Sequence, residues 1–253
     1  MADANCPICG GTGFKIVERG GLSGATPCEC SSRNRNRGLR EKASIPPNYE
    51  HATLEGFIVP HDNPIASSGL GHVLLQARGF ARNFPAVTPP GLLLCGEPGT
   101  GKTHLAVGVI KALMEKGHEC LFFDYQNLLD RIRSGYDAAS GASDREAYRS
   151  ALDAEVLLLD DLGAHRVTEW VEDTVTAIIT YRCNQRKPLI ATTNLPDPEV
   201  TGMVAEHSEP GRMPIYKKTL AEMIGSRARS RLFEMCKVVR MPVVEDYRVK
   251  TAR

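Results

Sequence analysis

The sequence predicts an α/β protein in which helices cover both faces of a parallel sheet, preceded by a small cysteine-rich module. From residue 92 onward, short apolar strands alternate with helical segments, a pattern that favours a parallel sheet. Runs such as "LLLC" and "VLLL" are typical of strands buried on both faces. By contrast, residues 1–31 are rich in Gly and Cys and too poor in large apolar residues to form a hydrophobic core unaided.

The composition indicates an ordinary globular protein. The chain has 253 residues, of which 42% are hydrophobic and 24% are charged. Its net charge of +1 gives no indication of a partner, so only local patches of charge can indicate one. The start "MADANCPICG" lacks the basic and apolar regions of a secretory signal, and no apolar run reaches the ~18 residues of a membrane span. We therefore expect a cytoplasmic protein with reduced cysteines and no membrane partner.

The predicted elements follow one another in an alternating order. Residues 32–42 carry five basic side chains and one acid and predict a basic linker or a short helix, and residues 43–57 are expected to be extended because Pro46 and Pro47 disfavour a helix. A flexible break is expected at 137–143 and an irregular stretch at 195–214. The predicted strands are 92–96, 120–125, 156–161, 188–194 and 237–241; the predicted helices are 65–84, 102–116, 126–136, 144–154, 168–186 and 219–235.

Residues 96–103, "GEPGTGKT", match the phosphate-binding pattern G-x-x-x-x-G-K-[ST] between a strand and a helix. Glycines allow backbone N–H groups to turn toward the phosphates, and the following helix directs its positive end at them. Lys102 then reaches the β- and γ-phosphates, and the Thr103 hydroxyl binds Mg²⁺. The sequence thus predicts ATP and Mg²⁺ as cofactors, with these nucleotide-binding residues: Gly96, Glu97, Pro98, Gly99, Thr100, Gly101, Lys102, Thr103, His104 and Asp160.

Polar residues at the ends of two later strands complete the predicted site. Asp160 ends an apolar strand and is expected to bind Mg²⁺ together with Thr103, whereas Asp161 would orient or deprotonate the attacking water. Asn194 follows the next strand and could bind the γ-phosphate or the water. Arg227 and Arg231 are four residues apart, so they share one face of a late helix.

This order of motifs resembles that of AAA+ ATPases. Residues 44–57, 92–106, 156–170, 181–195 and 230–241 together resemble the DnaC/DnaI helicase-loader family and its relative IstB, over roughly residues 44–249. The resemblance implies a three-layer α/β/α AAA+ domain in which Asp161 is the catalytic acid and Asn194 is sensor 1. It also implies that Arg231 is an arginine finger, with Arg227 beside it, acting on ATP held by a neighbouring subunit, and hence self-association. About a dozen residues follow residue 241, too few for a C-terminal helical lid.

Four cysteines near the N-terminus predict a zinc site. Cys6 and Cys9 form a C-x-x-C pair and Cys28 and Cys30 a C-x-C pair, which together supply the four thiolates of a tetrahedral Zn²⁺ site. "CPICGGTGF" also resembles the zinc modules of the DnaJ chaperone, and DnaI-type loaders have an N-terminal zinc module that meets the helicase. We expect a zinc module at 1–31, a basic linker at 32–50 and the AAA+ domain at 51–253. The other cysteines are expected to be buried hydrophobic residues: Cys95, Cys120, Cys183 and Cys236.

Two basic segments could contact DNA. The first is the run 33–42, which is either a solvated linker or a contact to the nucleic-acid backbone. The second lies within 125–150, where Arg131, Arg133, Arg145 and Arg149 interleave with Tyr136 and Tyr148; it is either a single-stranded DNA surface or an ordinary pair of amphipathic helices.

The function that these observations favour is an ATP-dependent, DnaC-like loader of the replicative hexameric helicase, acting on single-stranded DNA. The alternatives are an IstB-type ATPase that assists a transposase and a chaperone-like P-loop protein that uses its cysteine module on unfolded clients.

Overall fold

A computed structural model describes residues 3–20, 22–60, 63–134, 143–200, 202, 205–207 and 215–251. Most of the break predicted at 137–143, and Tyr136 beside it, lie outside these ranges.

The centre of the protein is a five-stranded parallel sheet, which confirms the predicted fold class. The strand order is β4-β5-β6-β3-β9, so β3 lies between two strands that come much later in the chain. The parallel pairs force the chain to cross over the sheet between strands, and helices form these crossovers. The strands are β3 (Gly91–Cys95), β4 (Cys120–Asp124), β5 (Val156–Asp160), β6 (Leu189–Thr193) and β9 (Cys236–Arg240).

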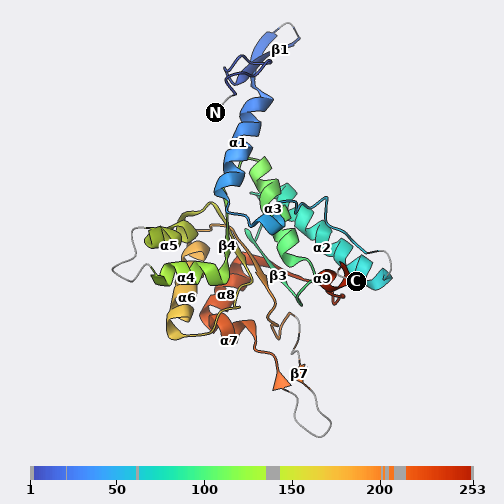
Figure 1. Ribbon diagram of the computed structural model, residues 1–253, viewed down its shortest axis with the longest axis vertical. Helices are drawn as coiled ribbons and strands as arrows, with labels where there is room; N and C mark the ends of the chain where they lie inside the picture. Colours follow the sequence, from blue (N-terminus) through green and yellow to red (C-terminus); the bar gives the residue numbers. More distant parts are fainter. Residues whose placement is uncertain are drawn as a thin grey trace.

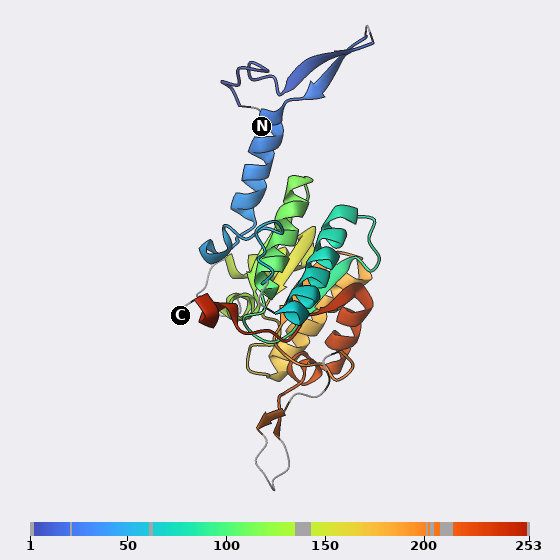
Figure 2. The ribbon, with the colours of Figure 1, turned by 90° about the vertical axis from the view of Figure 1, so that its right-hand side faces the viewer.

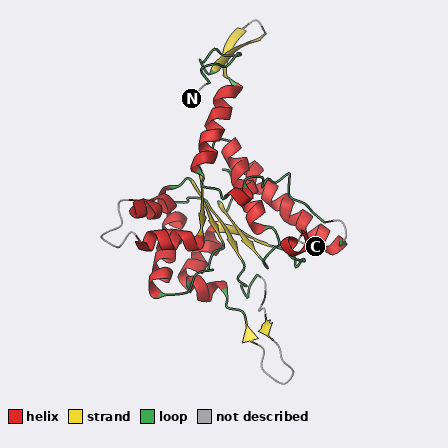
Figure 3. Ribbon diagram, in the orientation of Figure 1, coloured by secondary structure: helices red, strands yellow, loops and turns green. Residues whose placement is uncertain are grey.

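Helices cover both faces of the sheet, as Figures 1 and 3 show. One face packs against α2 (Pro64–Asn83) and α3 (Lys102–Glu115). The opposite face packs against α4 (Tyr125–Ser134), α5 (Ser143–Asp153), α6 (Glu169–Asn184), α7 (Leu220–Ile224) and α8 (Ser226–Met235). Successive strand residues point to opposite faces, so Leu92 and Leu94 join the first core and Leu93 and Cys95 the second.

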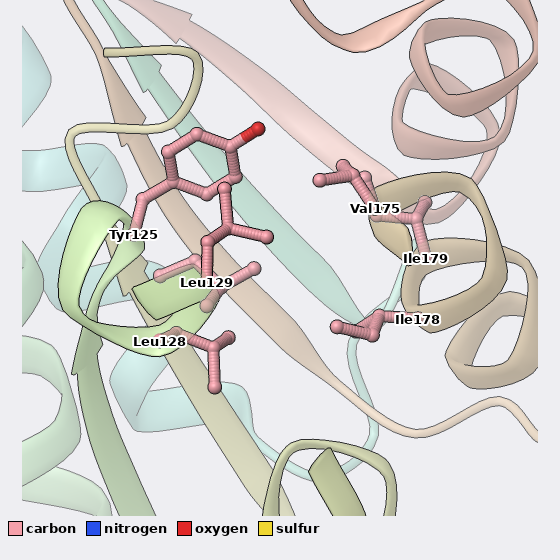
Figure 4. A pocket seen from close by; sticks show the side chains of 7 residues that line it. Tyr125, Leu128, Leu129, Val175, Ile178 and Ile179 are labelled. Carbon is pink, nitrogen blue, oxygen red and sulfur yellow. The ribbon is translucent and has the colours of Figure 1, made fainter. Parts of the chain in front are cut away.

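The second core contains one small cavity. Its volume is about 10 Å³, and Tyr125, Leu128 and Leu129 of α4 line it opposite Val175, Ile178 and Ile179 of α6 (Figure 4). The Tyr125 hydroxyl is buried and has no hydrogen-bond partner among the described residues. The cavity has room for about one water molecule and is far too small for a substrate.

The N-terminal module projects from this body (Figures 1 and 2). It contains an antiparallel hairpin of β1 (Phe14–Arg19) and β2 (Leu22–Pro27), which the sequence analysis did not predict, and it leads directly into α1 (Glu29–Lys42). Arg35 donates a hydrogen bond of 2.8 Å to the Gly117 carbonyl, and Arg40 lies 3.1 Å from Glu115. The basic segment is therefore a helix whose middle and C-terminal part contact the C-terminal end of α3 and the turn after it.

The chain after α1 runs along α3 in a mostly irregular conformation. It contains one short 3-10 helix, η1 (Pro47–Tyr49), and the buried Lys111 of α3 holds it by donating a 2.9 Å hydrogen bond to the Tyr49 carbonyl.

The structure corrects two predictions near the C-terminus. The single helix predicted at 219–235 is broken into α7 and α8 at Gly225, whose φ of 84° favours glycine. The stretch predicted to be irregular, 195–214, contains the short strand β7 (Ala205–His207), which pairs with β8 (Ile215–Tyr216) directly after that stretch. After β9, the described residues form one further element, α9 (Tyr247–Thr251). No helix within the described ranges combines the length and apolarity needed to span a membrane.

Candidate ATPase site and cysteine cluster

The phosphate-binding loop connects β3 to α3. Gly99 and Gly101 have φ values of 73° and 90°, which favour glycine, and α3 begins at the next residue, Lys102. A Cβ added at Gly101 would lie 2.6 Å from the Phe57 ring, so only glycine fits beneath that ring. The loop thus has the backbone that its motif predicts.

Lys102 points into the loop and is buried. Its Nζ donates hydrogen bonds to the carbonyls of Gly96 at 2.9 Å and Glu97 at 2.7 Å. Burial lowers the pKa of Lys102 to about 8, although the negative charges of Asp161 and Asp160 partly oppose this shift. A phosphate group would stabilise the protonated amine.

Asp160 lies at the end of β5 and is almost fully buried. It accepts a 2.7 Å hydrogen bond from the Thr192 hydroxyl of β6 and a hydrogen bond from the Thr103 hydroxyl. Burial raises the pKa of Asp160, and these two hydrogen bonds lower it in part. Thr103 and Asp160, the two predicted Mg²⁺ ligands, are therefore neighbours, and their oxygen atoms fit the ligand preference of Mg²⁺.

Asp161 follows in a left-handed conformation, with φ of 57°. Its N–H donates to the Thr192 hydroxyl at 2.9 Å, and its carboxylate accepts a 2.5 Å hydrogen bond from the Asn194 amide. Burial raises the pKa of Asp161, and the charge of Lys102 counteracts this effect. The structure thus brings Lys102, Asp161 and Asn194 to one edge of the sheet.

Two features of this site were not predicted. Thr192 binds both acidic residues; the only sequence signal was its position at the end of the strand beside β5. The segment after β9 also crosses the loop, because Met241 N–H donates to the Cys95 carbonyl at 2.7 Å and Tyr247 N–H to the Gly99 carbonyl at 3.2 Å. Next to Tyr247, the positive charge of Arg248 lowers the pKa of Asp161.

Two of the predicted nucleotide-binding residues make other contacts. His104 lies 2.9 Å from the Thr53 carbonyl and packs edge-on against Phe57, so it fastens the segment before α2 onto α3. Glu97 pairs with Lys217 at 2.9 Å.

The two predicted arginines of α8 are exposed and away from this cluster. The Arg231 guanidinium lies 2.6 Å from Glu234 one turn later, and Arg227 is exposed to solvent. Among the described residues, neither makes a hydrogen bond or ion pair with the phosphate-binding loop or the two acidic residues.

The four N-terminal cysteines form a compact buried cluster. Their sulfurs all lie within 4.8 Å of one another, with 3.8 Å between Cys6 and Cys28 and 3.4 Å between Cys9 and Cys30. A tetrahedron of sulfurs around zinc has edges of about 3.8 Å, so the cluster fits the ion. Although burial opposes ionisation of Cys9, the Gly13 N–H and other hydrogen-bond donors lower its pKa to about 6, which favours the thiolate.

Several basic residues of the two candidate DNA surfaces already make contacts within the protein. Besides the contacts of Arg35 and Arg40 with α3, Arg37 pairs with Glu41 on the exposed side of α1. On α4, the guanidinium groups of Arg131 and Arg133 lie over the rings of Phe123 and Trp170, at 5.6 Å and 5.9 Å. Tyr148 of α5 packs against the second core, and neither Tyr136 nor the Arg145 side chain lies in the described part.

Known proteins share this architecture. A family model described as IstB-like ATP binding protein matches residues 88–205. A crystal structure of the DnaC helicase loader superposes with a TM-score of 0.60 at 29% identity, covering 78% of this chain and 100% of that one. The chain has the fold of a DnaC/IstB-type AAA+ ATPase. A DnaI structure, at 22% identity and a TM-score of 0.54, shares the AAA+ fold over 80% of this chain and 94% of its own.

Two relatives found by sequence match a smaller share of this chain than the structures do. YqaM of Bacillus subtilis is 25% identical over 179 residues, which are 68% of this chain and 55% of YqaM. The replicative helicase loader DnaC of Escherichia coli is 21% identical over 165 residues, which are 65% of this chain and 64% of DnaC. The match therefore spans between 55% and 64% of the length of these relatives.

We predict that the purified AAA+ protein contains one zinc ion per chain and that Cys9→Ser removes it, because three thiolates and a hydroxyl bind zinc weakly. Metal analysis by mass spectrometry tests this. Cys120→Ser is the matched control, since Cys120 is a buried cysteine of β4 far along the chain from the cluster and should keep the zinc. Zinc-free wild-type protein, or undiminished zinc in Cys9→Ser, would exclude this site.

We also predict that MgATP binding takes up a proton at alkaline pH. In the protein without nucleotide the pKa of Lys102 is about 8, and the phosphates raise it. The affinity for MgATP is therefore highest below pH 8 and falls as the pH rises through that value. Calorimetry in two buffers of different ionisation enthalpy should detect uptake approaching one proton per ATP at pH 9 and much less at pH 7. Lys217→Gln, which removes a more exposed lysine beside Glu97, should leave this uptake unchanged; equal uptake at both pH values would contradict the assignment to Lys102.

Proposed function

We propose that this protein is an ATP-dependent loader of a replicative DNA helicase. The observation that carries the proposal is the match to the DnaC helicase loader, which covers the whole of that structure at 29% identity. The match to the IstB-like family model, over residues 88–205, includes the phosphate-binding loop and both acidic residues.

The proposed chemistry is hydrolysis of the γ-phosphoryl group. Lys102 and the backbone of residues 96–101 would bind the phosphates, while Thr103 and Asp160 would hold Mg²⁺, which would neutralise charge on the phosphates. Asp161 accepts a proton from a water molecule while the oxygen of that water attacks the γ-phosphorus. The bond between the γ-phosphorus and the oxygen that bridges it to the β-phosphorus breaks. The amide of Asn194 hydrogen-bonds Asp161 and so fixes the direction of that carboxylate.

The proposed finger acts between subunits. Arg231 lies on the outer side of α8 with 45% of its side chain exposed, and an exposed carboxylate, Glu234, is its partner. An exposed ion pair of this kind contributes little energy, so Arg231 can exchange Glu234 for a neighbour's γ-phosphate at small cost. Arg227 lies one turn earlier on the same face and accompanies it. Self-association through α8 is therefore part of the proposal.

The helicase contact is assigned to the cysteine module, which we place at 1–31, joined by residues 32–50 to an ATPase domain at 51–253. The module exposes four apolar side chains: Ile8 is 60% exposed, Phe14 58%, Ile16 80% and Leu22 79%. Phe14 and Ile16 share one face of β1, because alternate strand residues point the same way. Apolar side chains at this density favour a protein partner.

Single-stranded DNA is proposed to contact the exposed edges of α4, near Arg131 and Arg133, where charge and aromatic rings lie together. A cytoplasmic location follows from helicase loading.

The match to the IstB-like family favours a second candidate, an ATPase that assists a transposase. A chaperone-like role for the module is the third candidate, and the partner that co-purifies distinguishes the three.

We expect Ile16→Ser to weaken binding of the replicative helicase by tenfold or more, because an exposed apolar residue at the centre of an interface is a typical binding hot spot. Leu75→Ser on α2 is the matched control: Leu75 is 66% exposed, and its substitution should leave binding unchanged. Helicase binding by biolayer interferometry, and loading onto single-stranded DNA with ATP, are the measurements. If the wild-type protein captures a transposase or unfolded clients and not the helicase, the proposed function is wrong.

Mixing two inactive variants tests the finger. Arg231→Ala should bind ATP normally and Lys102→Ala should bind none, and each alone should lose ~10³-fold or more of the hydrolysis rate. In mixed assemblies an Arg231→Ala subunit supplies an intact ATP site and a Lys102→Ala subunit an intact finger, so partial activity should return. If mixed assemblies form and the rate stays at that of the separate variants, Arg231 does not act in trans.

A further inference from the structure

Helix α8 carries three arginines in the sequence "RARSR", and they do not face the same way. Residues two apart on a helix are separated by about 200°, so Arg229 points away from Arg227 and Arg231. The structure agrees, because Arg227 and Arg231 are exposed while 19% of the Arg229 side chain is accessible. Arg229 therefore has a different role from its neighbours.

Arg229 makes a two-pronged ion pair with Asp197. Its Nε lies 2.8 Å from one carboxylate oxygen and its Nη2 2.7 Å from the other, and Asp197 is fully buried. The guanidinium also lies 4.1 Å from the centre of the Phe233 ring and 3.0 Å from Glu199, whose side chain is 74% exposed. Paired geometry of this kind fixes orientation as well as distance.

Asp197 belongs to the short loop after β6, which contacts the catalytic centre and the helices at once. Asn194 at its start hydrogen-bonds Asp161, and the next residue, Leu195, packs so closely on Gly163 that a Cβ there would lie 2.3 Å away. The Pro196 carbonyl then accepts a 2.9 Å hydrogen bond from the N–H of Leu220, the first residue of α7. Four consecutive residues thus join the predicted catalytic acid to α7 and α8.

We infer that the Arg229–Asp197 pair is a positioning device that sets α8, and with it Arg231, against the loop carrying Asn194. The inference rests on the proposed finger role of Arg231. The pair decides where Arg231 is presented to the neighbouring subunit. Lysine cannot reproduce its geometry, because an ammonium group offers a single point of charge.

Arg229→Lys tests this with little change in volume or charge. The variant should keep its ATP dissociation constant and KM within about twofold, since its own phosphate-binding loop is intact, and lose tenfold or more of kcat. In mixed assemblies with Lys102→Ala, activity should return, because the Lys102→Ala subunit supplies a correctly placed finger. Asp197→Asn, which keeps the shape of the side chain and removes its charge, should behave in the same way.

Glu199→Gln is the matched control, because Glu199 is the exposed partner of the same guanidinium and its loss should leave kcat unchanged. Three results would each overturn the positioning role. They are an unchanged kcat in Arg229→Lys, a loss of activity that a rise in KM explains, and a loss of kcat that mixing does not restore.

Arg231→Ala, measured beside it, separates the two proposals. If Arg231→Ala is inactive and is restored by mixing while Arg229→Lys is not, only this inference fails. If Arg231→Ala hydrolyses ATP normally, both fail.

Discussion

The parallel pairing of β5, β6 and β3 is the constraint on which the rest of the site depends. Leu159 pairs with Ala191, and Cys95 with Thr193, so the three strands end at the same edge of the sheet. The pairing continues beyond the strands, because Gly96 N–H donates to the Thr193 carbonyl at 3.2 Å and Leu162 N–H to the Thr192 carbonyl at 2.8 Å. A slip of one residue in β6 would turn Thr192 away from both acidic residues.

Three partly buried charges meet at that edge, and none of them is stable there alone. Burial lowers the pKa of Lys102 and raises the pKa values of Asp160 and Asp161. Attraction between Lys102 and Asp161 opposes the shifts of these two groups, whereas hydrogen bonds from Thr192 and Thr103 oppose the shift of Asp160. The site is thus poised to exchange internal contacts for phosphate and a divalent cation. The Gly96 and Glu97 carbonyls that now hold Lys102 become replaceable acceptors once phosphate oxygens are present.

A continuous path of helices connects the cysteine cluster to the phosphate-binding loop. Cys28 precedes α1 directly and Cys30 lies in its first turn, so the cluster organises the start of that helix. The other half of α1 contacts the C-terminal end of α3, the helix that begins at Lys102. A two-stranded hairpin is marginally stable in water, so the β1–β2 hairpin depends on the cluster rather than on a core. The cysteine cluster at one end and the phosphate-binding loop at the other are therefore connected through the same pair of packed helices.

The sequence by itself determined the alternation of the five central strands with helices, the phosphate-binding loop, the two acidic residues and the four-cysteine set. These features are encoded by local periodicity and by short motifs with fixed spacing. Only the tertiary structure decided which of three similar arginines faces inward, because the partner of Arg229 is Asp197, 32 positions away, and a helical repeat alone does not say which face is covered. For the same reason the roles of Thr192 and of the segment around Tyr247 emerged only from the fold: strand register and chain crossing bring them to the loop. The break at Gly225 was hidden in a helical pattern, since the left-handed conformation of a glycine is imposed by packing on either side.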